Sequence, residues 1–206
     1  MFKYILGVMI FTLSGFASAE MHKGMFAYNY STIGADISAN GLTVDGDIKQ
    51  NSMIFGYFVN DNIELMGSKS TGKYELVGEE IDMDSSVFGF RYHTSRVDLR
   101  EGTGSGLSFG VSSNETKMNY AGVSAEGSET FLSTGYSTGL GNGLSFNFSF
   151  AAQADDIGDN NVIAVSLGKY ILEGICLQGG YHYSAANSDG ISIDGSGFSL
   201  GFGVLF

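Results

Sequence analysis

The side chains best suited to chemistry lie near the C-terminal end of the sequence. His182 stands two residues before Ser184, and Asp194 follows within the same region. A histidine can activate a serine hydroxyl as a nucleophile when a carboxylate orients the imidazole ring. These residue types therefore allow a hydrolytic triad, provided that all three side chains meet on one surface.

A second candidate cluster consists of Glu64, Arg91 and His93. Glu64 lies early in one alternating segment, and Arg91 and His93 lie late in the next, each among the small side chains of its segment. If the two segments are antiparallel neighbours, the three residues share one end of a sheet. Because an enclosed charge needs a partner, we expect an ion pair between Glu64 and Arg91 with His93 nearby. Such a pair would rigidify and plug an interior, or form a constriction for small ions.

Acidic residues gather in three short groups, which are Asp45-Gly46-Asp47, Glu79-Glu80-Ile81-Asp82 and Asp155-Asp156. Their spacing does not match a calcium-binding loop, which alternates its ligands around a glycine and ends on a distal glutamate. They are typical of solvated segments, with loose divalent-cation binding or an adhesive surface as the sharper interpretation. Cys176 is the only cysteine, which excludes a disulfide framework and a thiolate metal cluster. We expect no metal site and no cofactor.

Composition narrows the class of protein further. The formal net charge is −12, which argues against nucleic acid as a partner because phosphates are neutralised by lysine and arginine. The chain has 16 Phe, 11 Tyr and 31 Gly but no proline, an unusual composition for a soluble protein. Proline is absent where strand ladders must run uninterrupted. After residue 19 no segment is apolar for long enough to form a transmembrane helix.

Alternation with a period of two recurs along the chain and predicts ten strands. The expected strands are 25–32, 52–59, 63–71, 85–94, 107–112, 130–140, 144–150, 163–168, 175–185 and 197–206. Eight is the alternative count, which applies if the third segment, whose alternation is weaker, or the fifth segment is not a true strand. The links at 60–62, 140–143 and 171–174 are short, and those at 33–50, 72–84, 119–128, 155–160 and 186–195 are mostly longer and hold most of the acidic residues. The 95–106 link is the exception, because it is long although it lies at the end of the strands where the other links are short.

The two ends of the chain indicate export and membrane insertion. Residues 1–19 combine Lys3, an apolar run and the ending Ala17-Ser18-Ala19, which predicts a cleaved signal peptide followed by one domain at 20–206. In the last strand one face is large and apolar, and the other is small and uncharged. The apolar face comprises Phe198, Leu200, Phe202, Val204 and Phe206.

The polar faces of the strands favour a membrane barrel over a soluble β-sandwich. A soluble sheet presents lysine, glutamate and threonine to water, whereas these faces carry Ser, Gly, Asn and Ala. Small side chains suit the inside of a narrow barrel, and aromatic residues toward the strand ends suit a lipid-facing belt. We therefore expect an all-β, antiparallel, up-and-down barrel that closes on itself, because the backbone groups of a free strand edge would find no hydrogen-bond partner in lipid.

The signal peptide and the 197–206 strand resemble those of the small bacterial outer-membrane β-barrels, the superfamily of OmpA-like, OmpX-like and opacity-type proteins. The segment IFGYFVNDNIEL at 54–65 resembles the second hairpin of that superfamily. The resemblance implies a Gram-negative outer-membrane location, with lipid, lipopolysaccharide and the barrel-assembly machinery as partners. It also implies that the strand ending in Phe206 carries an assembly signal.

The sequence does not select one activity. A structural or surface-interaction role, similar to that of an adhesin with an extracellular ligand, is the primary expectation, and a narrow cation-preferring channel is the alternative. A third hypothesis rests on small outer-membrane lipid A deacylases, which place a histidine two residues before a serine nucleophile as His182 and Ser184 do. Their alternation puts both side chains inside the barrel, away from lipid, so we expect no enzyme.

Overall fold

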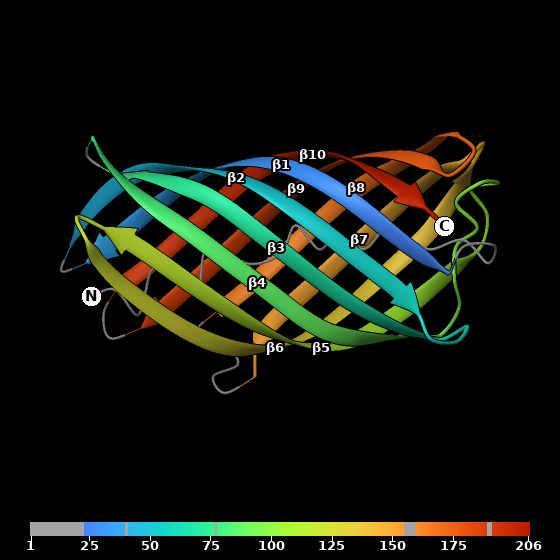
Figure 1. Cartoon of the computed structure of the whole chain (residues 1–206), viewed down its shortest axis with the longest axis horizontal. Helices are drawn as coiled ribbons and strands as arrows, with labels where there is room; N and C mark the ends of the chain where they lie inside the picture. Colours follow the sequence, from blue (N-terminus) through green and yellow to red (C-terminus); the bar gives the residue numbers. More distant parts are fainter. Residues whose placement is uncertain (1–22, 40, 77, 155–159, 189–190) are drawn as a thin grey trace.

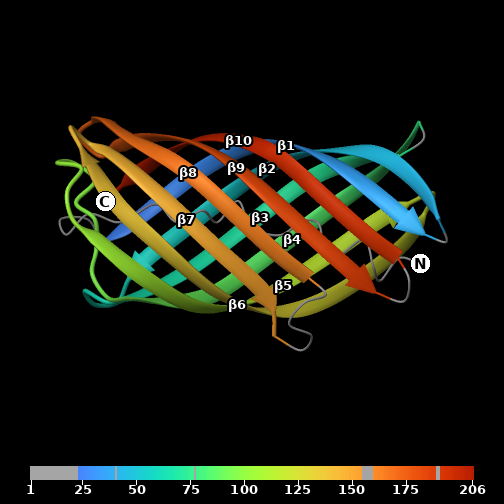
Figure 2. The same cartoon turned by 180° about the vertical axis from the view of Figure 1, so that it is seen from behind.

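The computed structural model describes residues 23–39, 41–76, 78–154, 160–188 and 191–206, and these form a closed barrel of ten antiparallel strands. Each strand pairs with its neighbours in sequence, and β1 pairs with β10 (Figures 1 and 2). The strands are β1 Gly24–Ala39, β2 Leu42–Phe58, β3 Ile63–Leu76, β4 Glu79–His93, β5 Ser105–Tyr120, β6 Val123–Gly141, β7 Leu144–Gln153, β8 Asn160–Leu172, β9 Ile175–Ser188 and β10 Ile191–Leu205. The predicted signal peptide lies outside the described residues. No helix in the described ranges is long and apolar enough to span a bilayer.

The predicted count of ten strands is confirmed, but the strands are longer than their apolar alternation indicated. Four of the expected acidic loops (33–50, 72–84, 119–128 and 186–195) are mostly strand, so that expectation was wrong. In those segments the charged residues alternate too, with carboxylates outward and apolar side chains inward. Gly41, Gly78 and Gly122 have positive φ, which lets the chain reverse tightly at these hairpins. The fifth expected loop, 155–160, falls largely on residues outside the described ranges.

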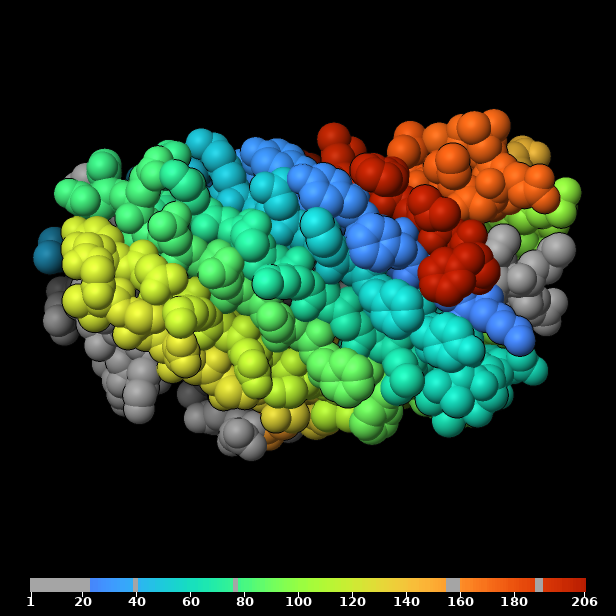
Figure 3. All heavy atoms as spheres, in the orientation of Figure 1, coloured from blue at the N-terminus to red at the C-terminus, as the bar shows by residue number. Residues whose placement is uncertain are grey.

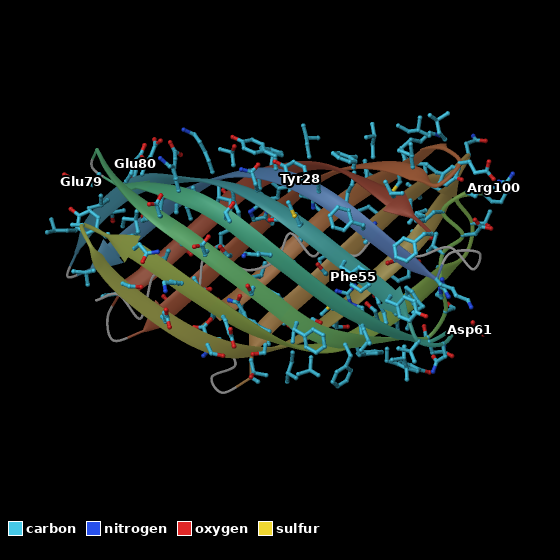
Figure 4. All side chains as sticks on the ribbon, viewed as in Figure 1. Tyr28, Phe55, Asp61, Glu79, Glu80 and Arg100 are labelled. Carbon is cyan, nitrogen blue, oxygen red and sulfur yellow. The ribbon has the colours of Figure 1, made fainter. Side chains whose placement is uncertain are left out.

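The barrel has two distinct ends. The terminal end holds the start of β1, Phe206, and the links after β2, β4, β6 and β8. The far end holds the other five links. In Figure 4, Asp61 and Arg100 lie at the terminal end, Glu79 and Glu80 lie at the far end, and Tyr28 and Phe55 lie between them.

The seam between β1 and β10 closes at the terminal end. The Phe206 amide donates to the Gly24 carbonyl and the Gly24 amide donates to the Phe206 carbonyl, both at 2.9 Å. A Cβ atom on Gly24 would lie 2.5 Å from the Phe206 ring, so the glycine makes room for the terminal aromatic side chain. The last residue therefore belongs to the ladder.

The outer surface divides into two zones along the strands. Toward the terminal end, outward side chains form an apolar belt, whose aromatic rings gather on that half of the molecule in Figure 3. On β4 the belt runs from Tyr92 to Phe88 and gives way to Asp84, whereas on β10 it runs from Phe206 to Phe198. Toward the far end, outward carboxylates and lysines form a zone that we call the collar. It comprises Asp36, Asp45, Asp47, Lys49, Lys73, Glu75, Glu80, Asp82, Asp84, Glu115, Lys117, Glu126 and Asp194.

Candidate functional site

The Glu64, Arg91 and His93 side chains meet inside the barrel near its terminal end. The cross-strand register places Glu64 on β3 directly opposite Arg91 on β4. Glu64 Oε2 lies 2.9 Å from His93 Nε2 and 3.6 Å from Arg91 Nη1, and all three side chains are buried. His93 is the closer partner of the carboxylate, because it reaches back along β4 toward the same oxygen. Gly56 on β2 leaves the space that Glu64 fills, since a Cβ there would lie 2.6 Å from Glu64 Oε1.

The link at 94–104 closes over this cluster and was missed as a functional element. Val97 is 1% exposed and Leu99 is 4% exposed, and both pack with inward side chains of other strands. These partners include Met25 on β1, Ile54 on β2, Met66 on β3, Cys176 on β9 and Leu205 on β10. We call this link the plug. The only sequence signal for it was its unusual length at the terminal end.

Several bonds hold the plug in place. The Asp98 carboxylate accepts hydrogen bonds from the Arg100 and Glu101 amides, which forms a compact turn. The Gly141 amide donates to the Gly102 carbonyl at 2.7 Å, and the Gly139 amide donates to Gly104 at 2.8 Å. The Arg96 guanidinium lies 3.9 Å from the centre of the Phe58 ring, within the range of a cation–π contact. The plug is therefore attached to β6 on one side and to β2 on the other.

The middle of the interior is lined by small polar side chains. One cross-strand row runs through Gln178, Gly201, Asn29, Ser52, Ser70, Ser85 and Thr116. Ser31 Oγ, Ser112 Oγ, Asn147 Oδ1, Ser166 Oγ and His182 Nε2 are buried and have no hydrogen-bond partner among the described residues. Buried polar groups of this kind are ordinarily satisfied by water. This zone is hydrophilic in character.

At the far end the interior changes character. Inward side chains of β1 to β5 and β10 form an apolar cluster that includes Ile33, Ile48, Tyr74, Met83, Met118 and Ile193. Burial, with a smaller contribution from the negative charge of Asp36, raises the pKa of Tyr74 to about 12. Behind the collar the wall thus has charged residues outside and apolar residues inside, the reverse of the belt.

Part of the collar is internally paired. Lys49 Nζ lies 3.3 Å from Glu75 Oε1, and Lys117 Nζ lies 2.7 Å from Glu126 Oε1. A hydrogen bond and the opposite charge raise the pKa of Lys73 and lower that of its partner Glu80. By contrast, Asp36 stands directly opposite Asp45 on β2 and Asp194 on β10. Like charges in such register destabilise a sheet, so the three carboxylates of this row repel one another.

The residues of the suggested triad do not share a face. His182 and Ser184 point into the interior, and the Ser184 hydroxyl donates to the Gly195 carbonyl at 3.5 Å. Asp194 points outward and accepts a hydrogen bond from the Tyr183 hydroxyl at 2.8 Å. Its carboxylate is therefore on the wrong side of the wall to orient His182. Within the described ranges, no group of three or more His, Cys, Asp or Glu residues could hold a metal ion.

Comparison with solved structures shows the same architecture in bacterial outer-membrane proteins. An outer-membrane channel from Pseudomonas putida F1 matches with a TM-score of 0.52 and 9% identity, over 96% of this chain and 100% of that one. OprG from Pseudomonas aeruginosa matches with a TM-score of 0.45 and 12% identity, over 92% and 99% of the two chains. Neisserial surface protein A matches at 0.44 and 13%, over 88% and 97%.

Neither a protein-family model nor a curated protein sequence matches the chain. The expected resemblance is therefore confirmed for the fold, which the solved barrels share at low sequence identity. A closed barrel leaves no free strand edge in lipid, and the belt presents an apolar surface to the hydrocarbon. The chain has the fold of the small Gram-negative outer-membrane β-barrels, and its location is the outer membrane.

Proposed function

We propose that this barrel is a surface-interaction protein, similar to an adhesin, whose collar contacts an extracellular partner. The observation that carries the proposal is that the strands continue past the belt as a hydrogen-bonded ladder. At that level the outward face is charged and the inward face is packed with apolar side chains. The collar is therefore a rigid platform above the membrane, and it needs no long loops to present its charges.

The three-carboxylate row of Asp36, Asp45 and Asp194 indicates the chemistry of the partner. A row of facing carboxylates is relieved by positive charge from outside the chain, because its members repel one another. A basic protein surface supplies such charge, as do divalent cations bridging to lipopolysaccharide. The terminal end of the barrel would face the periplasm, which leaves the collar outside the cell.

The test compares two triple variants with the same change in net charge. The substitutions Asp36→Asn, Asp45→Asn and Asp194→Asn remove the three-carboxylate row. The substitutions Glu75→Gln, Glu80→Gln and Glu126→Gln remove carboxylates already paired with lysine. Each variant is displayed on a non-adherent bacterial host and scored for attachment to epithelial monolayers. We expect the first set to lose attachment and the second to keep most of it. Equal loss of attachment in both variants would mean that only net charge matters. No loss of attachment in either variant would exclude the collar as the contact surface.

A cation-preferring channel is the second candidate, supported by the polar middle zone of the interior. Serine, asparagine and glycine line that zone, and several of its buried polar atoms have no hydrogen-bond partner among the described residues, which suits water and hydrated ions. The plug opposes conduction at the terminal end. Planar-bilayer recording of the intact protein separates the two roles: steady cation-selective conductance supports the channel, and silence leaves the surface role.

A further inference from the structure

An apolar groove with a volume of about 630 Å³ lies on the outer surface of β7 to β10. We call it the Gly179 groove. Its outward lining is almost wholly carbon and includes Phe146, Leu167, Gly179, Tyr181, Phe198 and Leu200. Figure 2 shows the four strands that form this side of the barrel.

The groove exists because position 179 has no side chain. Gly179 faces outward between Leu167 on β8 and Leu200 on β10, which are its direct cross-strand neighbours. A Cβ atom there would make only an ordinary contact, 3.4 Å from Leu200 Cδ2. The next residue, Gly180, differs, since its Cβ would lie 2.9 Å from the Val165 carbonyl. The backbone requires a glycine at 180 but not at 179.

The walls of the groove project well clear of the surface. Phe198 and Leu200 are 71% and 72% exposed, so they project from the belt. The Tyr181 and Phe198 rings meet edge to face with centroids 5.2 Å apart, which defines one end. Along β9 the outward residues are Ile175, Leu177, Gly179, Tyr181 and Tyr183, and Gly179 is the central one. The groove therefore lies at the middle depth of the belt.

The surroundings decide what fills such a groove. Water finds too few hydrogen-bond partners on an apolar lining, and an empty groove forfeits the dispersion contacts of its walls. The material available at this depth is lipid hydrocarbon. We propose that the Gly179 groove is a binding site for a lipid acyl chain, which it holds more tightly than the rest of the belt does.

The absence of tryptophan from the sequence allows a direct test. Tyr181→Trp places a fluorophore in the groove, and Phe88→Trp places one on β4, at an outward position of the belt outside the groove. The purified barrel in unbrominated detergent is titrated with phosphatidylethanolamine that carries dibrominated acyl chains, which quench tryptophan on contact. At one lipid per barrel we expect quenching at 181 to exceed that at 88 by about fivefold, equivalent to roughly 1 kcal/mol of preference.

A filling variant provides the control. Gly179→Leu in the Tyr181→Trp background should remove the difference, because the new side chain occupies the groove and stays within the apolar belt. Folding is checked by the change in gel mobility on boiling. Equal quenching at 181 and 88 without the filling substitution would overturn the proposal, whether or not Gly179→Leu folds. Weaker quenching at 181, together with cross-linked dimers, would also overturn it and assign the groove to a second copy of the chain.

Discussion

At the scale of single residues, the interior charges are the part of the site that the sequence located best. The alternation of β3 and β4 put Glu64, Arg91 and His93 on the inward faces near one end, and a burial argument paired them. That reasoning could not say that His93 would be the nearer partner of Glu64, because the choice depends on side-chain reach within the barrel. It also could not place Asp194, because residues 186–195 were expected to form a loop, whereas β10 continues through Asp194 with the alternation of Phe198.

Removing the Glu64 carboxylate should destabilise the barrel. Glu64→Gln leaves the Arg91 guanidinium buried without its counter-charge, which costs roughly 3 kcal/mol or more. The matched control is Glu75→Gln, which breaks the exposed pair with Lys49 and should cost at most about 1 kcal/mol. Denaturant unfolding in detergent micelles measures both. Equal midpoints for the two variants would show that the interior cluster contributes no more than a surface pair.

Tyr74 should make the barrel sensitive to alkali. Burial raises its pKa to about 12, whereas the pKa of an unfolded tyrosine is about 10. The folded state therefore holds its proton longer, and this contribution to stability is full below pH 10 and is lost as the pH rises through 12. Unfolding measured across this range should show a steeper loss in the wild type than in Tyr74→Phe. Parallel pH profiles would contradict the assignment.

At the scale of elements, strand number was predictable and strand length was not. Large apolar residues on the lipid-facing side marked each strand in the sequence, so ten segments were predicted. Beyond the belt the outward residues become charged, as at Asp84 and Asp82 on β4, and the pattern resembles a solvated loop. The plug was unpredictable for another reason. Val97 and Leu99 are buried by residues from β1, β2, β3, β9 and β10, contacts that only closure of the barrel creates.

Opening the plug should make the interior permeable. Val97→Ser with Leu99→Ser removes the apolar contacts that hold the link against the inner wall, and it leaves the β4 and β5 ladder intact. The matched control is Arg100→Ser with Glu101→Ser, at exposed positions of the same link. Planar-bilayer recording should show ion conductance for the first pair only. A folded plug variant as silent as the control would show that the far-end apolar cluster around Ile48 and Tyr74 closes the interior without the plug.

The C-terminal strand should govern assembly through its last residue. We propose that Phe198, Leu200, Phe202, Val204 and Phe206 form the assembly signal, since all five project outward from the strand that closes the seam. Phe206→Ala should slow the appearance of heat-modifiable barrel in the outer membrane. Phe88→Ala removes a similarly exposed ring from β4 and should not. Pulse-chase fractionation compares the rates, and equal rates for both variants would place the signal elsewhere.

At the scale of the whole molecule, the apolar side of the barrel wall changes from outside to inside along the same strands. In the belt the apolar side faces lipid and the polar side faces the interior, whereas in the collar the polar side faces water and the apolar side packs inward. On β2, for example, Phe55 faces out and Ser52 faces in, but further along Lys49 faces out and Ile48 faces in. The alternation along each strand therefore continues unbroken. The face that meets lipid in the belt meets water in the collar, and the face that is polar in the belt is apolar in the collar.

The unequal height of the belt has a mechanical consequence for the surrounding bilayer. On β10 the outward apolar run spans Phe198 to Phe206, about twice the length of the run from Phe88 to Tyr92 on β4. A flat hydrocarbon slab cannot match both sides of an upright cylinder. Either the cylinder leans, or the lipids beside β4 thin to meet it. If the cylinder stays upright, the bilayer is thinner beside β4 than beside β10, and neighbouring proteins with short hydrophobic spans would be drawn to the β4 side.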